Sequence, residues 1–490
     1  MSSSGVHRIL PVVNVLGLLQ ITFSLAYFMP ITWSLIVSDG AVQYFVDAMI
    51  FGMSFGTAMW FFTRKFKREL QPRDGFLLVT LSWVLMAGIA AVPLMLAIDG
   101  LSFTDAFFET MSGLTTTGAT VLTGLDKLPP SINLWRHELN WLGGMGIIVL
   151  AVAILPMLGV GGMQLYKAET PGPMKDAKLT ARIADTAKAL WLVYFGITVA
   201  CIASLKVAGL SWLDAVCHAF ATMALGGFST YDDSIGHFNS PLVEFILIFF
   251  MLVAAMNFAT HYLAFRQRSL RTYLADSEAV AVVIVIASSC FGVALYLRAL
   301  GTYPDFLTAL RHASFNLVSI ATDCGFASVD FDKWPAFAPW WMLFLSCVAV
   351  SSGSTGGGIK MIRTLIFVRH GAREMLRLIH PAAIRLIHIG RMTIPDAVAT
   401  SVLGFILLYL MSIVFMTFLL VFSGLDFVSS LSAIIACINN AGPGLNVVGP
   451  AQNYAPLSDF QTWVCAVTML LGRLEVLSMV VLFTPYFWRN

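Results

Sequence analysis

Leu101-Ser-Phe-Thr-Asp105 and Leu210-Ser-Trp-Leu-Asp214 are two versions of one short stretch, and each is followed by a glycine after the same interval. Thirteen residues separate Asp105 from Gly118 and Asp214 from Gly227. The apolar segment in this interval has about 14 residues, or about 20 Å as a helix, whereas crossing the bilayer core takes about 20 residues. We therefore expect helices that enter a membrane without leaving on the far side.

The same plan occurs four times along the chain. The four short apolar segments are residues 103–114, 212–225, 306–321 and 427–439. Each lies between longer apolar runs and ends at a glycine loop; the loops are Thr116-Thr117-Gly118-Ala119-Thr120, Gly226-Gly227-Phe228-Ser229, Asp323-Cys324-Gly325-Phe326-Ala327 and Asn440-Ala441-Gly442-Pro443. The fourth loop differs, since Pro443 follows its glycine. Repetition of this kind predicts four copies of one unit: span, half-membrane helix, loop, span.

The longer apolar runs indicate an all-α integral membrane protein. Of the 490 residues, 58% are hydrophobic and 11% charged, whereas a soluble domain has about 25% charged residues. Runs at 12–37, 75–97, 242–265, 279–297 and 397–422 each approach or exceed the roughly 18 residues that span hydrocarbon. We count about ten such spans by this criterion. The run at 12–37 is too long for a signal peptide and lacks a cleavage site, so we interpret it as a retained helix.

The repeats divide the chain into five parts. Two spans, 12–37 and 46–62, precede the first repeat and form an added hairpin. We assign 1–73 to this N-terminal hairpin, 74–180 to repeat 1, 181–275 to repeat 2, 276–392 to repeat 3 with a broken last helix and a basic linker, and 393–490 to repeat 4.

Basic residues cluster in alternate connections, which predicts the orientation in the membrane. The clusters are Arg64, Lys65, Lys67, Arg68 and Arg73; Lys167, Lys175, Lys178, Arg182 and Lys188; Arg266, Arg268 and Arg271; and Arg369, Arg373, Arg377, Arg385 and Arg391. Only scattered Lys127, Arg136, Lys206, Arg298, Arg311 and Lys333 occupy the other connections. By the positive-inside rule the clusters are cytoplasmic, and both termini fall on that side. The net charge of +2 gives no indication of nucleic-acid binding.

The glycine loops suit the chemistry of a cation pathway. Non-helical backbone inside a membrane is tolerated only where protein or a water-filled cavity satisfies it. Converging carbonyl oxygens replace the hydration shell of a cation, and glycine adopts the backbone angles that such lining requires. A glycine also commonly ends an ordinary core helix, but four occurrences at one position of four repeats favour the cation pathway.

These four loops, the repeats around them and the N-terminal hairpin resemble the Trk/Ktr/HKT superfamily of potassium transporters, specifically its TrkH/TrkG branch. The resemblance covers essentially the whole chain. It implies the pore-forming subunit of a potassium uptake system in the bacterial inner membrane, a homodimer with one pore per protomer. It also implies gating by a cytoplasmic ring of nucleotide-binding TrkA-like subunits. We expect no bound cofactor, with potassium as the transported substrate.

The resemblance also assigns the residues of a potassium-binding filter. These are Thr116, Thr117, Gly118, Leu225, Gly226, Gly227, Asp323, Cys324, Gly325, Asn440, Ala441 and Gly442. In the family, glycine in all four loops goes with potassium preference, whereas serine in the first loop is linked to sodium transport. The longer Thr-Val-Gly-Tyr-Gly signature of tetrameric channels does not occur, so we expect a shorter and less discriminating filter.

A second motif, Ser351-Ser-Gly-Ser-Thr-Gly-Gly-Gly358 followed by Ile359 and Lys360, interrupts the last span of repeat 3. Each glycine costs a helix about 1 kcal/mol, so we expect a break here. A phosphate-binding loop is disfavoured, because Lys360 is one position late and no Gly-Lys-Ser/Thr follows. The resemblance assigns a mobile gate loop below the filter to Gly353, Gly356, Gly357, Gly358 and Lys360.

Arg473 and Glu475 occur inside the last predicted span, where charges are costly and indicate function. They either pair structurally or face a pore. Two positions apart on one helix they would point about 200° away from each other, so we expect different partners. The resemblance implies that Arg473 projects into the conduit beneath the filter as an electrostatic barrier.

Other charged features have two interpretations each. Asp105, Asp126, Asp232, Asp233, Asp330, Asp332 and Asp459 lie on the outer side and either concentrate cations or merely solvate loops. Arg369, Arg373 and Arg377 share one helical face, which either meets lipid or docks the regulatory ring. A proton- or sodium-coupled secondary transporter is the alternative function, disfavoured because the repeats all run in the same direction. A membrane enzyme lacks any motif here, since the nine histidines are dispersed.

Overall fold

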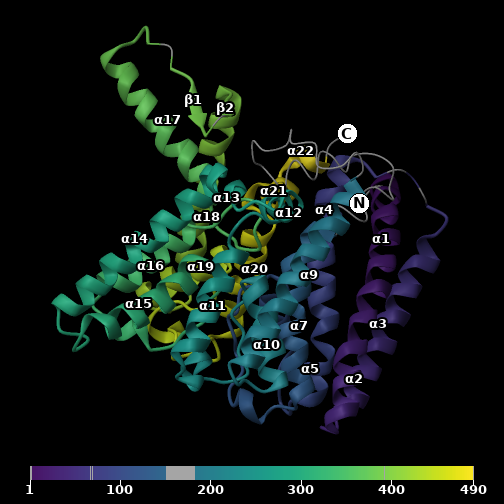
Figure 1. Ribbon diagram of the computed structural model, residues 1–490. Helices are drawn as coiled ribbons and strands as arrows, with labels where there is room; N and C mark the ends of the chain where they lie inside the picture. Colours follow the sequence, from purple (N-terminus) through teal and green to yellow (C-terminus); the bar gives the residue numbers. More distant parts are fainter. Residues whose placement is uncertain are drawn as a thin grey trace.

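The computed structural model describes residues 3–149 and 183–488, apart from residues 67, 69, 384 and 391. Within these residues the chain is a bundle of helices (Figure 1). The predicted N-terminal hairpin consists of α1 (Ser3–Ser24), α2 (Phe28–Val37) and α3 (Val42–Thr63). Gly17 and Gly56 let α1 and α3 approach closely, because a Cβ on Gly17 would lie 2.7 Å from the carbonyl oxygen of Gly56.

The remaining helices follow the order predicted for the repeats. Residues 74–180 contain most of α4 (Pro72–Ala90), then α5 (Val92–Ala97), α6 (Phe103–Leu114) and α7 (Pro130–Val149). Residues 181–275 contain α9 (Ile183–Val207), α10 (Trp212–Ala224), α11 (Pro241–Ala254), α12 (Phe258–Gln267) and α13 (Arg271–Ala275). Residues 276–392 contain α14 (Ser277–Ala299), α15 (Phe306–Ala321), α16 (Phe337–Val348), α17 (Met361–Ile379) and β1 (Ile387–Ile389). The last part contains α18 (Asp396–Phe422), α19 (Phe427–Asn439), α20 (Asp459–Arg473), α21 (Val476–Val480) and α22 (Pro485–Trp488).

The four short helices α6, α10, α15 and α19 begin in the same way. At each N-terminus a serine or aspartate side chain accepts the amide of the residue three positions on; the pairs are Ser102 and Asp105, Ser211 and Asp214, Asp305 and Thr308, and Asp426 and Ser429. Such caps satisfy backbone donors that a helix start leaves unpaired. The Leu-Ser-x-x-Asp stretches are therefore helix starts, and three of the four predicted segments match their helices residue for residue. The predicted segment 212–225 is one residue longer than α10.

Within the described residues, six helices are long and apolar enough to cross a membrane, or up to eight if two bent pairs each form one span. The bent pairs correct two predictions of continuous spans. The predicted span 242–265 is broken between α11 and α12, which are bent by 95°, because Asn257 starts a new helix by accepting the amide of Ala259. The last span is broken after Arg473, with a bend of 112°.

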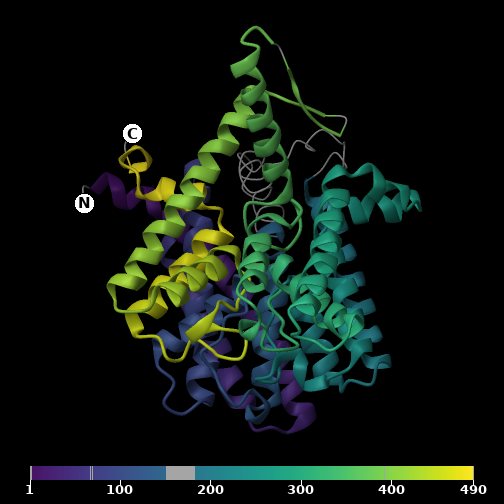
Figure 2. The ribbon, with the colours of Figure 1, turned by 90° about the vertical axis from the view of Figure 1, so that its left-hand side faces the viewer.

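A two-stranded antiparallel sheet corrects the expectation of purely helical structure. β1 pairs with β2 (Met392–Ile394) across a turn at Gly390, whose φ is +56°. Ile387, Ile389 and Ile394 pack with Ile362 and Ile366 of α17. Helix α17 and this hairpin project from one end of the bundle in two perpendicular views (Figures 1 and 2).

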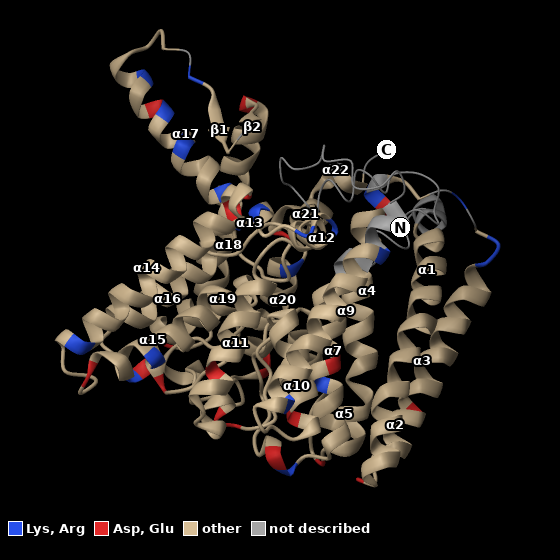
Figure 3. Cartoon of the chain, viewed as in Figure 1, with Lys and Arg blue, Asp and Glu red and all other residues tan. Residues whose placement is uncertain are grey.

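Charged side chains are sparse along the bundle and concentrate at its ends and on α17 (Figure 3). Arg266, Arg268 and Arg271, on or beside α12 and α13, lie at the end from which α17 projects. Part of the charge prediction falls outside the described residues: Lys67, Lys167, Lys175, Lys178, Arg182, Arg391 and Arg489. The predicted boundary between repeats 1 and 2, at 180 and 181, also lies outside them.

Candidate functional site

The four glycine loops have one backbone conformation. The residue two positions before each loop glycine is left-handed, with φ of 54° at Thr116, 54° at Leu225, 64° at Asp323 and 58° at Asn440. The next amide donates to the carbonyl five positions earlier at 2.8 Å in every case; the pairs are Thr117 to Ser112, Gly226 to Ala221, Cys324 to Ser319 and Ala441 to Ala436. This bonding pattern ends a helix in a Schellman turn. Non-glycine residues in this conformation are strained, so the surrounding structure must hold them.

The four loop glycines close a ring. A Cβ on Gly118 would lie 2.4 Å from the carbonyl oxygen of Gly226, and one on Gly227 would lie 2.0 Å from that of Cys324. In the same way Gly325 faces the carbonyl of Ala441 at 2.5 Å, and Gly442 faces that of Thr117 at 2.7 Å. Each loop therefore abuts the carbonyl of the next, and the fourth abuts the first. All four glycines have positive φ, so a side chain there would be both strained and obstructed.

Around this ring the outer segments are joined in the same cyclic order. Asp232 accepts the amides of Gly124 at 2.7 Å and Leu125 at 3.1 Å, and the amide of Gly236 donates to the carbonyl of Ala327. Asp332 accepts the amide of Asn446 at 3.0 Å, and Tyr454 donates to Thr120 and Gly442. Asp232 and Asp332 thus join loops, which corrects their interpretation as free outer carboxylates.

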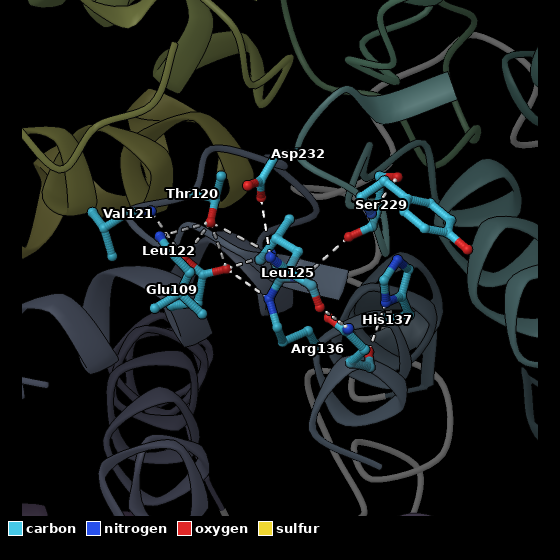
Figure 4. Close-up of polar contacts among 11 residues, drawn as sticks. Glu109, Thr120, Val121, Leu122, Leu125, Arg136, His137, Ser229 and Asp232 are labelled. Atoms are coloured by element: carbon cyan, nitrogen blue, oxygen red, sulfur yellow. Dashed lines mark hydrogen bonds and ion pairs between the residues drawn. The ribbon is translucent and has the colours of Figure 1, made fainter. Parts of the chain in front are cut away.

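A buried ion pair supports the first loop from behind (Figure 4). Arg136 of α7 binds Glu109 of α6 at 2.7 Å, and the two side chains are 1% and 0% exposed. Glu109 accepts the Thr120 hydroxyl and the Val121 amide, while Arg136 donates to the carbonyl of Ser229. The pair therefore fixes loop 1 against loop 2. It was not predicted from the sequence, where Arg136 is grouped with outer residues; an arginine and a glutamate in neighbouring apolar helices are its only signal.

The predicted gate loop lies directly beneath the ring. A Cβ on Gly357 would lie 2.1 Å from the carbonyl oxygen of Asn439, at the end of α19, and the Gly357 amide donates to Asp323 at 3.1 Å. The Thr355 hydroxyl donates to the carbonyl of Met223, near the end of α10. The predicted break is confirmed, since α16 ends at Val348 and α17 begins at Met361. The glycines here pack tightly, rather than lacking contacts as a purely flexible plug would.

Other predicted gate residues turn the chain. Gly353, with φ of +78°, abuts the Asn257 side chain, and its carbonyl accepts the Phe258 amide. Gly358 and Lys360 also have positive φ, 69° and 73°. The bend between α11 and α12 is therefore in contact with the gate loop.

Glu278 of α14 holds both ends of the gate loop, and it was not among the residues predicted from the sequence. One carboxylate oxygen accepts the Ser352 amide at 2.7 Å, the Ser352 hydroxyl at 3.0 Å and the Ile362 amide at 3.0 Å. The residue is 5% exposed. Its only sequence signal is an acidic residue at the start of an apolar run.

Replacing Glu278 by alanine should raise cation flux through the purified protein severalfold, because two buried amides lose their acceptor at about 1–3 kcal/mol each. Glu278→Gln should stay near the parent, since an amide oxygen accepts the same donors. Flux into liposomes measures both. Equal flux for Glu278→Ala and Glu278→Gln would contradict this role.

Arg473 and Glu475 have different partners, as predicted, although the reason given was wrong. Helix α20 ends at Arg473, and Glu475 has φ of +56°, so the two do not share a helix. Arg473 donates to the carbonyls of Thr355 at 2.8 Å and Gly143 at 2.6 Å. Glu475 pairs with Arg363 at 2.8 Å. Arg473 therefore bridges the gate loop and α7.

The basic face of α17 is only partly a surface. Arg373 is 5% exposed and pairs with Asp396 of α18 and with Glu374, so the interpretation as a lipid-facing or docking side chain is wrong for this residue. Arg377 is half-exposed and binds Glu374. All seven cysteines lie in the described part of the chain and are free, and no metal-binding group of histidine, cysteine and acidic residues occurs among the described residues.

Comparisons with known proteins agree in one family. Residues 41–489 match the family model described as "TrkH: Cation transport protein". The chain is 46% identical to the Trk system potassium uptake protein TrkH of Halomonas elongata, over 98% of this chain and 99% of that protein. Identity to the Escherichia coli K12 protein of that name is 43%, and to TrkG of the same strain 36%, each over 98% of this chain, with 99% and 98% of the relatives covered. The crystal structure of the potassium transporter TrkH from Vibrio parahaemolyticus aligns with a TM-score of 0.89 at 40% identity, covering 98% of this chain and all of that one.

Proposed function

Because this chain belongs to the TrkH family of cation transport proteins, we propose that it takes up potassium through the ring of four glycine loops. The filter consists of the twelve residues assigned from the sequence, with main-chain carbonyls replacing water around a partly dehydrated ion. The relatives are named potassium uptake proteins. The single observation that carries the proposal is the cyclic contact of Gly118, Gly227, Gly325 and Gly442 with carbonyls of the adjoining loops.

Electrostatics support a cation. The four short helices all end at the ring, and the C-terminal end of a helix has partial negative charge. The described chain offers no cluster of metal-ligating side chains, and a filter made of carbonyls needs none. We propose transport without enzymatic chemistry, in a homodimer of the bacterial inner membrane with both termini cytoplasmic.

Gating belongs to the loop from Gly353 to Lys360 beneath the ring, under the control of a cytoplasmic TrkA-like nucleotide-binding ring. Helix α17 begins one residue after this loop and projects from the bundle. A partner that displaces α17 would therefore pull on the gate loop directly. The name of the relatives, "Trk system", agrees with a protein of several subunits.

The alternative is a secondary transporter that couples potassium or another solute to protons or sodium. The equivalent backbone of all four loops favours a single cation pathway over inverted repeats. Potassium flux into liposomes without a proton or sodium gradient distinguishes the two, since a coupled transporter would require the second ion.

Gly118→Ser should weaken the preference for potassium over sodium while the protein still inserts. The added Cβ would meet the Gly226 carbonyl at 2.4 Å, so that carbonyl must turn away from its present direction. Relative potassium and sodium fluxes in liposomes test this. Gly292→Ser is the control, because a Cβ on Gly292 meets nothing within 4 Å. An unchanged flux ratio for Gly118→Ser would show that the ring is not the filter.

A further inference from the structure

Four oxygen atoms surround two adjacent glycines of the gate loop. A Cβ on Gly356 would lie 3.3 Å from a carboxylate oxygen of Asp323 and 3.3 Å from the carbonyl oxygen of Thr322. A Cβ on Gly357 would lie 2.1 Å from the carbonyl oxygen of Asn439 and 3.1 Å from the amide oxygen of Asn440. Loops 3 and 4 thus place two side-chain and two main-chain oxygens against the loop, at the inner end of the ring.

The two side chains occupy equivalent positions in their repeats. Asp323 and Asn440 are both the left-handed residue that precedes the loop glycine by two positions. The corresponding residues of loops 1 and 2 are Thr116 and Leu225, which have no carboxylate or amide oxygen. Oxygen-rich side chains therefore occur only in the two loops that face Gly356 and Gly357.

Both side chains keep one oxygen without a hydrogen-bond partner in the described part of the chain. Asp323 is 0% and Asn440 is 1% exposed, and Oδ1 of each has no donor there. The other Asp323 oxygen accepts the Gly357 amide, and the Asn440 amide group donates to Thr117 and Met469. A buried, unsatisfied oxygen costs free energy, so its retention at two equivalent positions points to a partner in another conformation.

The gate loop itself compensates Asp323 in the present conformation. It supplies the Gly357 amide at 3.1 Å, and the Lys360 ammonium acts on the same carboxylate electrostatically. Both groups belong to the loop and leave with it. Displacement of the loop would then expose a carboxylate with no compensating charge at the inner end of the pathway.

We propose that Asp323 and Asn440, together with the carbonyls of Thr322 and Asn439, form an inner site for a partly dehydrated alkali cation when the gate loop moves away. Oxygen atoms alone suit a hard cation. The loop seals these oxygens now, so gate opening and the appearance of the site are one event. This inference rests on the proposed function, because it requires ions to pass the ring and the loop to move.

The test compares potassium dependence of uptake in a protein whose loop is displaced. Gly357→Ala supplies that background, and thallium or rubidium entry into liposomes reports uptake over a range of potassium concentrations. Adding Asp323→Asn should raise the half-saturating concentration by about fivefold, the factor expected from one unit charge at about 4 Å in a water-like dielectric. Adding Asn440→Asp should lower it, because the site then has a second carboxylate.

Asp126→Asn is the matched control, since Asp126 is an exposed outer carboxylate, and it should leave the half-saturating concentration unchanged. Asp323→Glu retains the charge and should stay near the Gly357→Ala background even if Asp323→Asn folds poorly. Increased uptake with an equal half-saturating concentration in the Asp323 and Asn440 variants would overturn the inner site alone. No increase for Gly357→Ala would overturn the gate, and the inner site with it.

Discussion

Replacing Gly357 by alanine should strongly raise potassium uptake into liposomes, with no partner subunit present. The added methyl would lie 2.1 Å from the carbonyl oxygen of Asn439, so the loop and the end of α19 must separate. Overpacking of this kind costs about 1–3 kcal/mol, which shifts a two-state loop toward its displaced form by about fivefold to a hundredfold.

Gly371→Ala is the control, because Gly371 lies on α17 and a Cβ there meets nothing within 4 Å. Deleting Gly356 to Gly358 should act in the same direction as Gly357→Ala, since it removes the segment that contacts Asn439. Uptake per folded protein is the measurement. A Gly357→Ala protein that folds and conducts like the parent would remove the gating role of the loop.

Replacing Arg473 by alanine should raise potassium flux severalfold, for two reasons that the structure joins. A guanidinium near the pathway repels an entering cation by roughly 1–4 kcal/mol, depending on the local dielectric. The same group donates to the carbonyl of Thr355 at 2.8 Å and of Gly143 at 2.6 Å, so its loss also loosens the gate loop from α7.

Arg473→Lys separates the electrostatic and the bridging contributions. Lysine retains the charge, but a single ammonium lacks the planar fork with which arginine reaches two carbonyls. We expect flux between that of the parent and that of Arg473→Ala, measured per folded dimer in liposomes. If Arg473→Ala only lowers the yield of folded protein and leaves flux per molecule unchanged, Arg473 is structural and the barrier assignment is wrong.

Features that depend on neighbouring residues in the chain were predictable. The bounds of α6, α15 and α19 follow from capping residues and apolar length, and the break before Lys360 follows from the glycine run. The ion pair of Glu109 with Arg136 was missed, because α6 and α7 meet only through packing. The break between α11 and α12 was missed because residues 242–265 are apolar throughout, and length with hydropathy says nothing about a bend.

The sequence by itself determined that this chain has four short helices ending at four glycine loops, since caps, apolar runs and glycines act over a few residues. The tertiary structure alone decided that each glycine abuts the carbonyl of the next loop, that Glu475 pairs with Arg363, and that Asp323 meets the Gly357 amide. These partners are separated in the chain by tens to hundreds of residues. Their contacts depend on how whole helices pack, and no local pattern of polarity encodes that.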